Sequence, residues 1–333
     1  MFISINKSKD SFSILLFPLL YFVPLLLRES LNNYVSKNIY DLLNYLAFSS
    51  LFIFYFRDKK VSIKNKRKKG IKAKNFSKNK IIFILLSMIF LIIYNFLNIF
   101  FNLKKQNVYK IRKIMQMFFL FLNNSLFFKK TIYIHHNFSI FIIFIIIIAQ
   151  IIKLKLQVVH QIISNMISNF CYAFSILLIK YINYTYFLSI FLLGSMLGLI
   201  EFTMELSNML IKNCNLIQEY NSIDNKLWIF ILFFAHLSIH FMFHYLIMKF
   251  NPIHSYISSS FAYTIYNLII NFKNQNIFEL ILDLIMLFAC MVYLEILELN
   301  CCSMNYNLKK TIHNRAIKEI ENIIDNDSSL ESQ

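Results

Sequence analysis

The chain has 333 residues, of which 58% are hydrophobic, 17% aromatic and only 15% charged. Soluble domains carry about a quarter charged residues, so this composition argues against a soluble globular protein. Only three glycines and three prolines occur, too few for a loop-rich α/β enzyme with many tight turns. The formal net charge of +17 raises the question of nucleic-acid binding, which depends on where the positive charges lie.

Apolar segments of roughly 20 residues recur along the chain, and this is the length that an α-helix needs to cross a bilayer. We therefore expect an all-α polytopic membrane protein with about ten transmembrane helices. In chain order the segments cover residues 11–27, 40–56, 81–103, 111–128, 133–152, 158–182, 186–206, 227–248, 252–272 and 278–299.

Segment 57–80, RDKKVSIKNKRKKGIKAKNFSKNK, is the long polar interruption in the first part of the chain. It holds twelve Lys or Arg and one acid, for a net charge of +11. Because it lies between two apolar segments, we expect it to stay cytoplasmic and to touch anionic lipid head groups, not nucleic acid. Ten spans then place both termini in the cytoplasm. Without this segment the remaining Lys and Arg show no bias between the two sides.

The layout divides near residue 154 into two halves of five segments. The first half, 1–154, includes the basic loop, the second covers 155–299, and residues 300–333 form a polar tail that we expect in the cytoplasm. Each half has an odd number of segments, so the two halves must be inverted relative to each other. Inverted repeats place a binding site between the halves, near the midplane of the membrane.

Three histidines mark the eighth segment. His236, His240 and His244 recur every fourth residue, so they share one helix face over about 12 Å. Ionisable groups inside a membrane are costly and mark functional positions. These histidines are candidates for substrate binding or proton transfer, with hydrogen bonding across helices and a metal site as alternatives. We expect no metal, because no Cys or carboxylate lies near them in the sequence.

The seventh segment combines small and acidic residues. Gly194 and Gly198 form a GxxxG pattern, which favours close helix packing, with a gating hinge as the alternative. Glu201 and Glu205 follow on one face and either couple protons or mark the membrane interface, and Glu201 is our candidate for coupling. Ser258, in the run of serines that opens the ninth segment, either lines a pore or packs against a neighbour.

Cations at segment ends are candidates for binding an anionic solute. Lys110, Arg112 and Lys113 precede or open the fourth segment, where they could compensate the charge of a phosphate or form an ordinary interfacial cluster. Lys180 closes the sixth segment and either snorkels to the interface or reaches into a cavity. Asp283, inside the tenth segment, is a second candidate for proton coupling and needs a partner, for which Lys180 is one possibility.

Three stretches carry a resemblance to a known family. They are YKIRKIMQMFFLFLNNSLFFKK (109–130), SNFCYAFSILLIKYI (168–182) and KFNPIHSYISSSF (249–261). They are similar to three spans of the drug/metabolite transporter superfamily. The first stretch resembles the fourth span, which ends in a basic pair, and the second resembles the sixth span, which closes with Lys. The third resembles the ninth span, which opens with Pro and small residues. In architecture the chain resembles this superfamily over nearly its whole length, most closely the branch of nucleotide-sugar and triose-phosphate translocators.

The resemblance implies a secondary transporter that moves a small polar metabolite by alternating access, with phosphorylated or nucleotide-linked solutes as candidates. We expect it in an endomembrane of the Golgi or ER, with the plasma membrane as the alternative. The expected partners are the solute, the lipid bilayer and a second copy of the chain as a homodimer. No cofactor or enzyme activity is expected. The alternatives are a structural or adaptor membrane protein that works through its basic loop and tail, and a membrane-embedded enzyme that uses the histidines.

Overall fold

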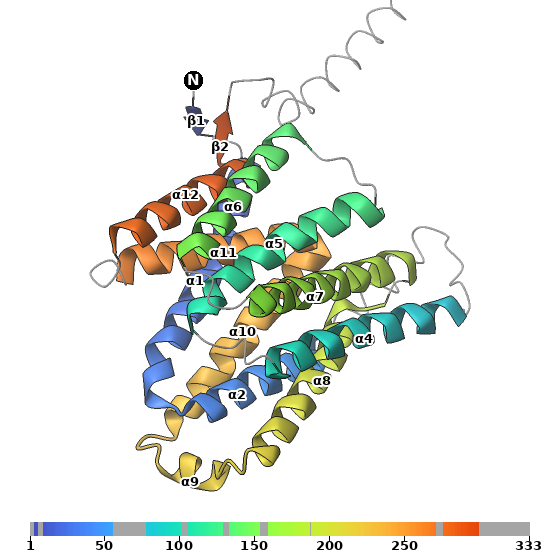
Figure 1. Ribbon diagram of the computed structural model, residues 1–333, viewed down its shortest axis with the longest axis vertical. Coiled ribbons are helices and arrows are strands. Elements are labelled where there is room, and N and C mark those ends of the chain that lie inside the picture. Colours follow the sequence, from blue (N-terminus) through green and yellow to red (C-terminus); the bar gives the residue numbers. More distant parts are fainter. Residues whose placement is uncertain are drawn as a thin grey trace, which may run out of the picture.

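The computed structural model describes residues 3–5, 9–55, 78–100, 106–128, 133–153, 159–186, 188–270 and 276–299. Most of the basic segment 57–80 and all of the tail 300–333 lie outside these residues, so the expectations about them stay predictions. The described part is almost entirely helical (Figure 1). The all-α prediction is confirmed, apart from one short pair of strands.

Each of the ten predicted apolar segments coincides with a helix. In the first half these helices are α1 (Lys9–Leu31), α2 (Lys37–Ser49), α4 (Lys78–Phe100), α5 (Gln106–Phe128) and α6 (Ile134–Lys153), and α2 continues as the 3₁₀ helix η2 (Ser50–Phe54). In the second half they are α7 (Val159–Tyr186), α8 (Ile190–Ile211), α10 (Leu227–Lys249), α11 (Pro252–Ile270) and α12 (Ile277–Tyr293). Two short helices, η1 (Asn32–Tyr34) and α9 (Leu216–Asn221), lie in connections.

Within the described residues, five helices are long and apolar enough to cross a membrane: α4, α6, α7, α8 and α10. The most apolar is α4, whose stretch Ile81–Asn98 has a mean hydropathy of 2.4 while only 22% of it is buried inside the protein. An exposed apolar face of this length is costly in water and stable in lipid. These helices are compatible with an integral membrane protein.

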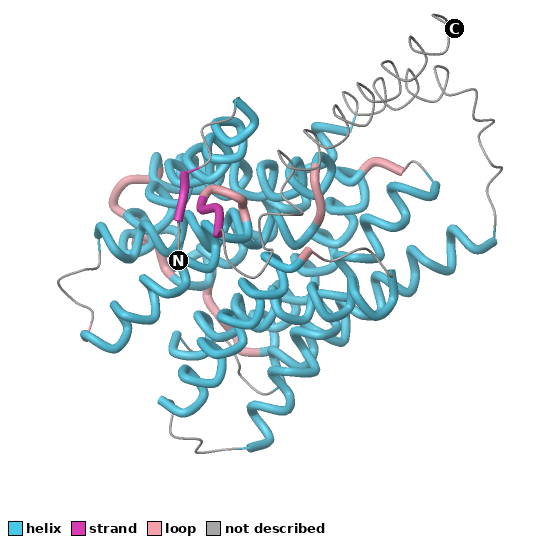
Figure 2. Tube along the Cα trace, turned by 90° about the horizontal axis from the view of Figure 1, so that it is seen from above, coloured by secondary structure: helices cyan, strands magenta, loops and turns pink. Residues whose placement is uncertain are grey.

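The tenth segment ends differently from its prediction. Helix α12 stops at Tyr293, and Leu297–Leu299 form strand β2, which pairs antiparallel with strand β1 (Ile3–Ile5). The two strands lie side by side in Figure 2. The pairing supplies the backbone hydrogen bonds that a continued helix would have made, and it ties the start of the chain to the end of α12.

The helices of the two halves pack between one another in matched pairs. Counted within each half, equivalent helices are α1 and α7, α2 and α8, α4 and α10, α5 and α11, and α6 and α12. Three equivalent pairs are in direct contact: α2–α8, α5–α11 and α6–α12. Other contacts come in couples that exchange when the halves are exchanged: α4–α7 with α1–α10, α5–α7 with α1–α11, α4–α8 with α2–α10, and α5–α6 with α11–α12. Helices α7 and α10 also each contact α8 and α11, and these four contacts have no equally extensive counterpart when the halves are exchanged.

Side-chain contacts give the relative direction of α4 and α7. The rings of Phe83 and Tyr181 lie 5.1 Å apart, and near the other end of the pair the Ser168 hydroxyl donates to Asn98 Oδ1 over 3.2 Å. Later residues of α4 thus lie beside earlier residues of α7, and the two helices run antiparallel. This is the relation expected of the third and sixth crossings of a chain that alternates direction at every crossing.

Candidate functional site

Helices α2 and α8 meet without a side chain between their backbones. A Cβ atom on Gly198 would lie 2.5 Å from the amide nitrogen of Ser49 and 2.7 Å from the carbonyl carbon of Phe48. One turn earlier, a Cβ atom on Gly194 would lie 2.7 Å from Nε2 of His244 on α10. The packing interpretation of this GxxxG pattern is confirmed, since the missing side chains admit both the α2 backbone and an imidazole.

The histidine face of α10 is turned toward α2. His236 meets the ring of Tyr40 edge-on at 4.8 Å, and His240 stacks on Phe48 at 4.7 Å with an interplanar angle of 7°. His244 lies 5.2 Å from the same phenylalanine ring. Residue numbers rise together along both helices, so α2 and α10 run parallel. Parallel packing is the relation expected if α2 and α10 are the second and eighth crossings of a chain that reverses direction at every crossing.

Two hydrogen bonds determine which ring nitrogens on the histidine face of α10 donate and which can accept. The Nε2 group of His240 donates to Oδ1 of Asn44 over 3.0 Å, which is a bond across helices. The Nδ1 group of His244 donates to the carbonyl oxygen of His240 over 2.8 Å, so Nε2 of His244 keeps its lone pair. That nitrogen is buried and has no hydrogen-bond partner in the described part of the chain. In the neutral ring it can accept a proton or a hydrogen bond.

Glu201 lies two turns beyond Gly194 on α8 and is 7% exposed. Its carboxylate is close enough to the phenols of Tyr45 on α2 and Tyr172 on α7 for its charge to act on both. Tyr172 also hydrogen-bonds Tyr256 of α11. Helices α2, α7, α8 and α11 therefore bring the buried carboxylate of Glu201 together with the phenols of Tyr45, Tyr172 and Tyr256.

Glu205, one turn further along α8, is also buried and accepts a hydrogen bond of 3.3 Å from Asn208. Both glutamates face the interior of the protein, and burial in the helix bundle is compatible with a position at the membrane interface. Coupling of protons by Glu201 stays a prediction.

Arg28 is a polar residue of this region that the sequence did not single out. It lies in the last turn of α1, is buried, and forms an ion pair with the neighbouring Glu29. Its charge acts on His236 and His240. An Arg-Glu pair at the end of an apolar segment resembles an ordinary helix terminus, and only the packing of α1 on α10 brings this cation to the histidines.

Lys180 occupies a different position from the one predicted. Its Nζ donates to the carbonyl oxygens of Ile247 and Met248, over 2.7 Å and 3.0 Å. A cation on the last carbonyls of α10 satisfies acceptors that the helix leaves open and complements its dipole. The proposed pairing of Lys180 with Asp283 is wrong, because Asp283 lies elsewhere, beside Asn267 near the other end of α11.

Asp283 lines a small pocket among α5, α6, α11 and α12, with a volume of about 40 Å³. Its polar lining residues are Gln150, Ser260, Tyr263, Thr264, Asn267 and Asp283. A volume of this size holds about three water molecules, so it suits water or a small ion better than a metabolite. Ser258 is buried on α11 and is not among the residues that line this pocket.

The remaining candidates are the cations of the fourth segment. Arg112 is buried in the first turns of α5, whereas the side chains of Lys110 and Lys113 lie outside the described residues. The structure thus brings the histidines to the contact of α2, α8 and α10. It places Glu201 beside Tyr45 of α2 and Tyr172 of α7, and Lys180 and Asp283 in two other locations.

No protein-family model matches the chain, and a search of curated proteins finds no match. Function is therefore inferred from the geometry and chemistry of the residues themselves.

Proposed function

We propose that the protein is a secondary transporter that works by alternating access, built from two inverted halves of five spans. The observation that carries the proposal is the set of matched helix contacts, in which α2 and α8 meet at Gly198 of α8. Contacts that recur when the halves are exchanged are expected of a pseudo-two-fold arrangement. In transporters of this kind the halves rock against each other around a site that lies between them.

Helix directions support ten crossings. The antiparallel α4–α7 pair and the parallel α2–α10 pair each have the direction that strict alternation requires. The same alternation puts Lys180 and Lys249, at the ends of the sixth and eighth helices, on the side of the basic segment 57–80. Cations at these positions fit a cytoplasmic face. In this proposal the protein lies in an endomembrane and both of its termini are in the cytoplasm.

The solute site in this proposal is the contact of α2, α8 and α10. Glu201 takes and releases the coupling proton, and Nε2 of His244 accepts a hydrogen bond from the solute. Arg28, near His236, is paired with Glu29, and an anionic group of the solute would compete with that carboxylate for the guanidinium. This chemistry suits a small polar metabolite that is phosphorylated or nucleotide-linked, as in the drug/metabolite transporter superfamily that the sequence resembles.

Thermal unfolding of the purified protein tests the proposal, because a ligand that binds only the folded state stabilises it by about 2.7 kcal/mol at 100 times its Kd. We expect one class among nucleotide sugars, phosphorylated metabolites and amino acids to raise the melting temperature. Glu201→Gln and His244→Gln should weaken that shift. The matched control is Thr203→Ala, which lies on the exposed face of α8 and should keep the shift. Absence of a shift with every class would count against the proposal.

A further inference from the structure

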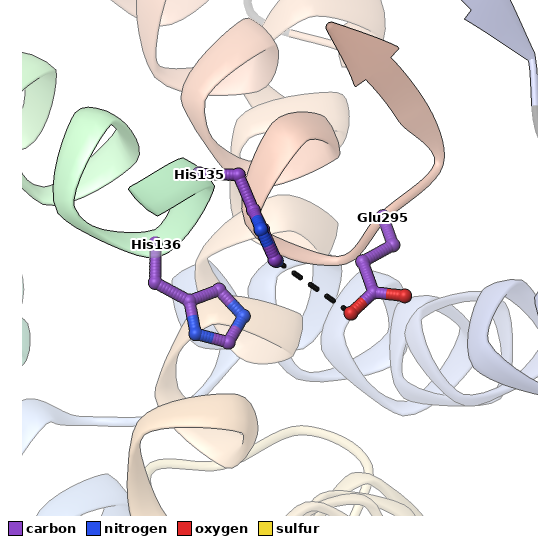
Figure 3. Close-up of side chains that lie close together, drawn as sticks. All are labelled: His135, His136 and Glu295. Atoms are coloured by element: carbon purple, nitrogen blue, oxygen red, sulfur yellow. Dashed lines mark ion pairs between the residues drawn. The ribbon is translucent and has the colours of Figure 1, made fainter. Parts of the chain in front are cut away.

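Two histidines and a glutamate gather where α6 begins and α12 ends. His135 and His136 open α6, and Glu295 follows the last turn of α12. Their ligand atoms all lie within 4.8 Å of one another. Figure 3 shows the carboxylate of Glu295 turned toward the His135 ring, with His136 beside it. Residues 160 positions apart in the chain meet here because α6 packs on α12.

The central distance fits two ligands of one metal ion. Nε2 of His135 lies 3.5 Å from Oε1 of Glu295, which is long for a hydrogen bond between these groups. Metal–ligand bonds of about 2.0–2.1 Å in a tetrahedral site place neighbouring ligand atoms about 3.3–3.5 Å apart. The pair therefore has the spacing of a coordination edge.

Burial supplies a second, independent observation. The His135 side chain is only 2% exposed. Neither of its ring nitrogens has a hydrogen-bond partner among the residues that the structure describes. Buried polar atoms are normally satisfied, and leaving them without a partner is costly. A metal ion bound at Nε2 would satisfy one of the two nitrogens.

The backbone of Glu295 adds a third observation. Helix α12 closes with a hydrogen bond of 2.9 Å from the Ile296 amide to the Met291 carbonyl, and Glu295 sits in the left-handed region at φ 58°. This position of a helix end normally carries Gly or Asn. Helix α8 ends in the same way with Asn213 at φ 52°. A glutamate held in this conformation points to a role for its side chain.

We propose that His135, His136 and Glu295 bind one transition-metal ion of the zinc class. Two imidazoles and one carboxylate are a ligand set that zinc uses, and imidazole disfavours magnesium and calcium. The His136 ring stacks on Tyr293 at 4.2 Å, which holds its orientation. The ion would join the fifth helices of the two halves next to the β1–β2 pair. This proposal does not depend on the transport function.

Metal content of the purified full-length protein tests the site. After treatment with a chelator, the protein is loaded with Zn²⁺ or with Co²⁺, whose visible spectrum reports coordination by nitrogen and oxygen. We expect one ion per chain in the wild type and at least tenfold weaker binding in His135→Gln and in Glu295→Gly. His240→Gln is the matched control, since it removes a half-buried histidine from α10, which contributes no ligand to the site, and it should bind as the wild type does.

Glu295→Gly separates metal binding from folding, because glycine removes the ligand and also suits the left-handed backbone. After chelation, Glu295→Gly should melt at or above the melting temperature of the wild type. Added Zn²⁺ should then raise the melting temperature of the wild type but not that of Glu295→Gly. A wild type that binds no more metal than Glu295→Gly would overturn the proposal and leave His135 and Glu295 as an ion pair. Equal stabilisation of both proteins by Zn²⁺ would overturn it as well.

Discussion

Gly198 approaches Ser49 so closely that a Cβ atom at its position would lie 2.5 Å from the Ser49 amide nitrogen. The two residues belong to α8 and α2, which are the second helices of the two halves in our proposal. At their contact the two helices lie backbone against backbone. Glu201 and His244 lie within two helical turns of it, along α8 and on α10, so packing and chemistry meet at one location.

Replacing Gly198 with alanine should destabilise the protein. The added methyl group meets backbone atoms of α2, which cannot turn aside as a side chain can, and overpacking of this kind costs about 1–3 kcal/mol. Gly194→Ala should cost less, because the ring of His244 can shift. Thermal unfolding in detergent measures both changes. Leu199, which is 54% exposed, gives the control Leu199→Ala, expected within about 0.5 kcal/mol of the wild type. Equal stability of Gly198→Ala and Leu199→Ala would refute the close contact.

The hydrogen bond between Asn44 and His240 should appear as a coupling energy. In a double-mutant cycle with Asn44→Leu and His240→Phe, we expect about 0.6 kcal/mol and at most about 1.7 kcal/mol, the range found for such bonds between membrane helices. The cycle of Asn44→Leu with His236→Phe is the control, because His236 packs on Tyr40 instead. Coupling as large in the control cycle would show that the two helices are not aligned as described.

Lys180→Gln should lower stability and leave solute affinity unchanged. Its Nζ caps the carbonyls of Ile247 and Met248, and hydrogen bonds to a charged group contribute about 1.5–3 kcal/mol. Lys249→Gln removes an exposed cation from the same end of α10 and should change stability by less than about 0.5 kcal/mol. Unfolding temperature and solute titration separate the two roles. Loss of affinity without loss of stability would restore Lys180 to the solute site.

Single cysteines at exposed positions test the proposed crossings. The substitutions are made in a background without the native cysteines. Tyr184→Cys lies at the end of α7, the sixth proposed crossing. Ile211→Cys lies at the end of α8, the seventh, and Ile277→Cys at the start of α12, the tenth. These side chains are 79%, 81% and 78% exposed. Ten alternating crossings predict that a membrane-impermeant thiol reagent labels Ile211→Cys and Ile277→Cys from one face and Tyr184→Cys from the other. Labelling of Tyr184→Cys and Ile211→Cys from the same face would exclude α8 as a span.

The positions of the helices could be predicted from the sequence because apolar length alone determines them. The predicted segment 186–206 illustrates this. Its apolar residues and its two glycines are readable without any partner, and it overlaps most of α8 (Ile190–Ile211). The end of α12 could not be predicted in the same way. It depends on pairing between Ile3–Ile5 and Leu297–Leu299, and no local signal near residue 295 reports a strand almost 300 positions earlier.

The site was predictable only where it is local. Four-residue spacing placed His236, His240 and His244 on one face, but it could not identify α2 as the surface that this face meets. The sequence also paired Lys180 with Asp283 by charge, whereas the structure gives Lys180 two backbone carbonyls. The carbonyl oxygens at a helix end are present whatever the side chains are, so the sequence does not show them. Pairing residues by charge alone therefore predicts the wrong partner for a cation at such a position.

Solute exchange by the protein in sealed proteoliposomes tests the central claim most directly. Vesicles are preloaded with an unlabelled nucleotide sugar or phosphorylated metabolite, and uptake of the labelled compound is followed over time. We expect exchange by the wild type and by Thr203→Ala, and at least a tenfold slower rate for Glu201→Gln. Exchange by Glu201→Gln at the wild-type rate, or no exchange of any of these solutes by the folded wild type, would contradict it.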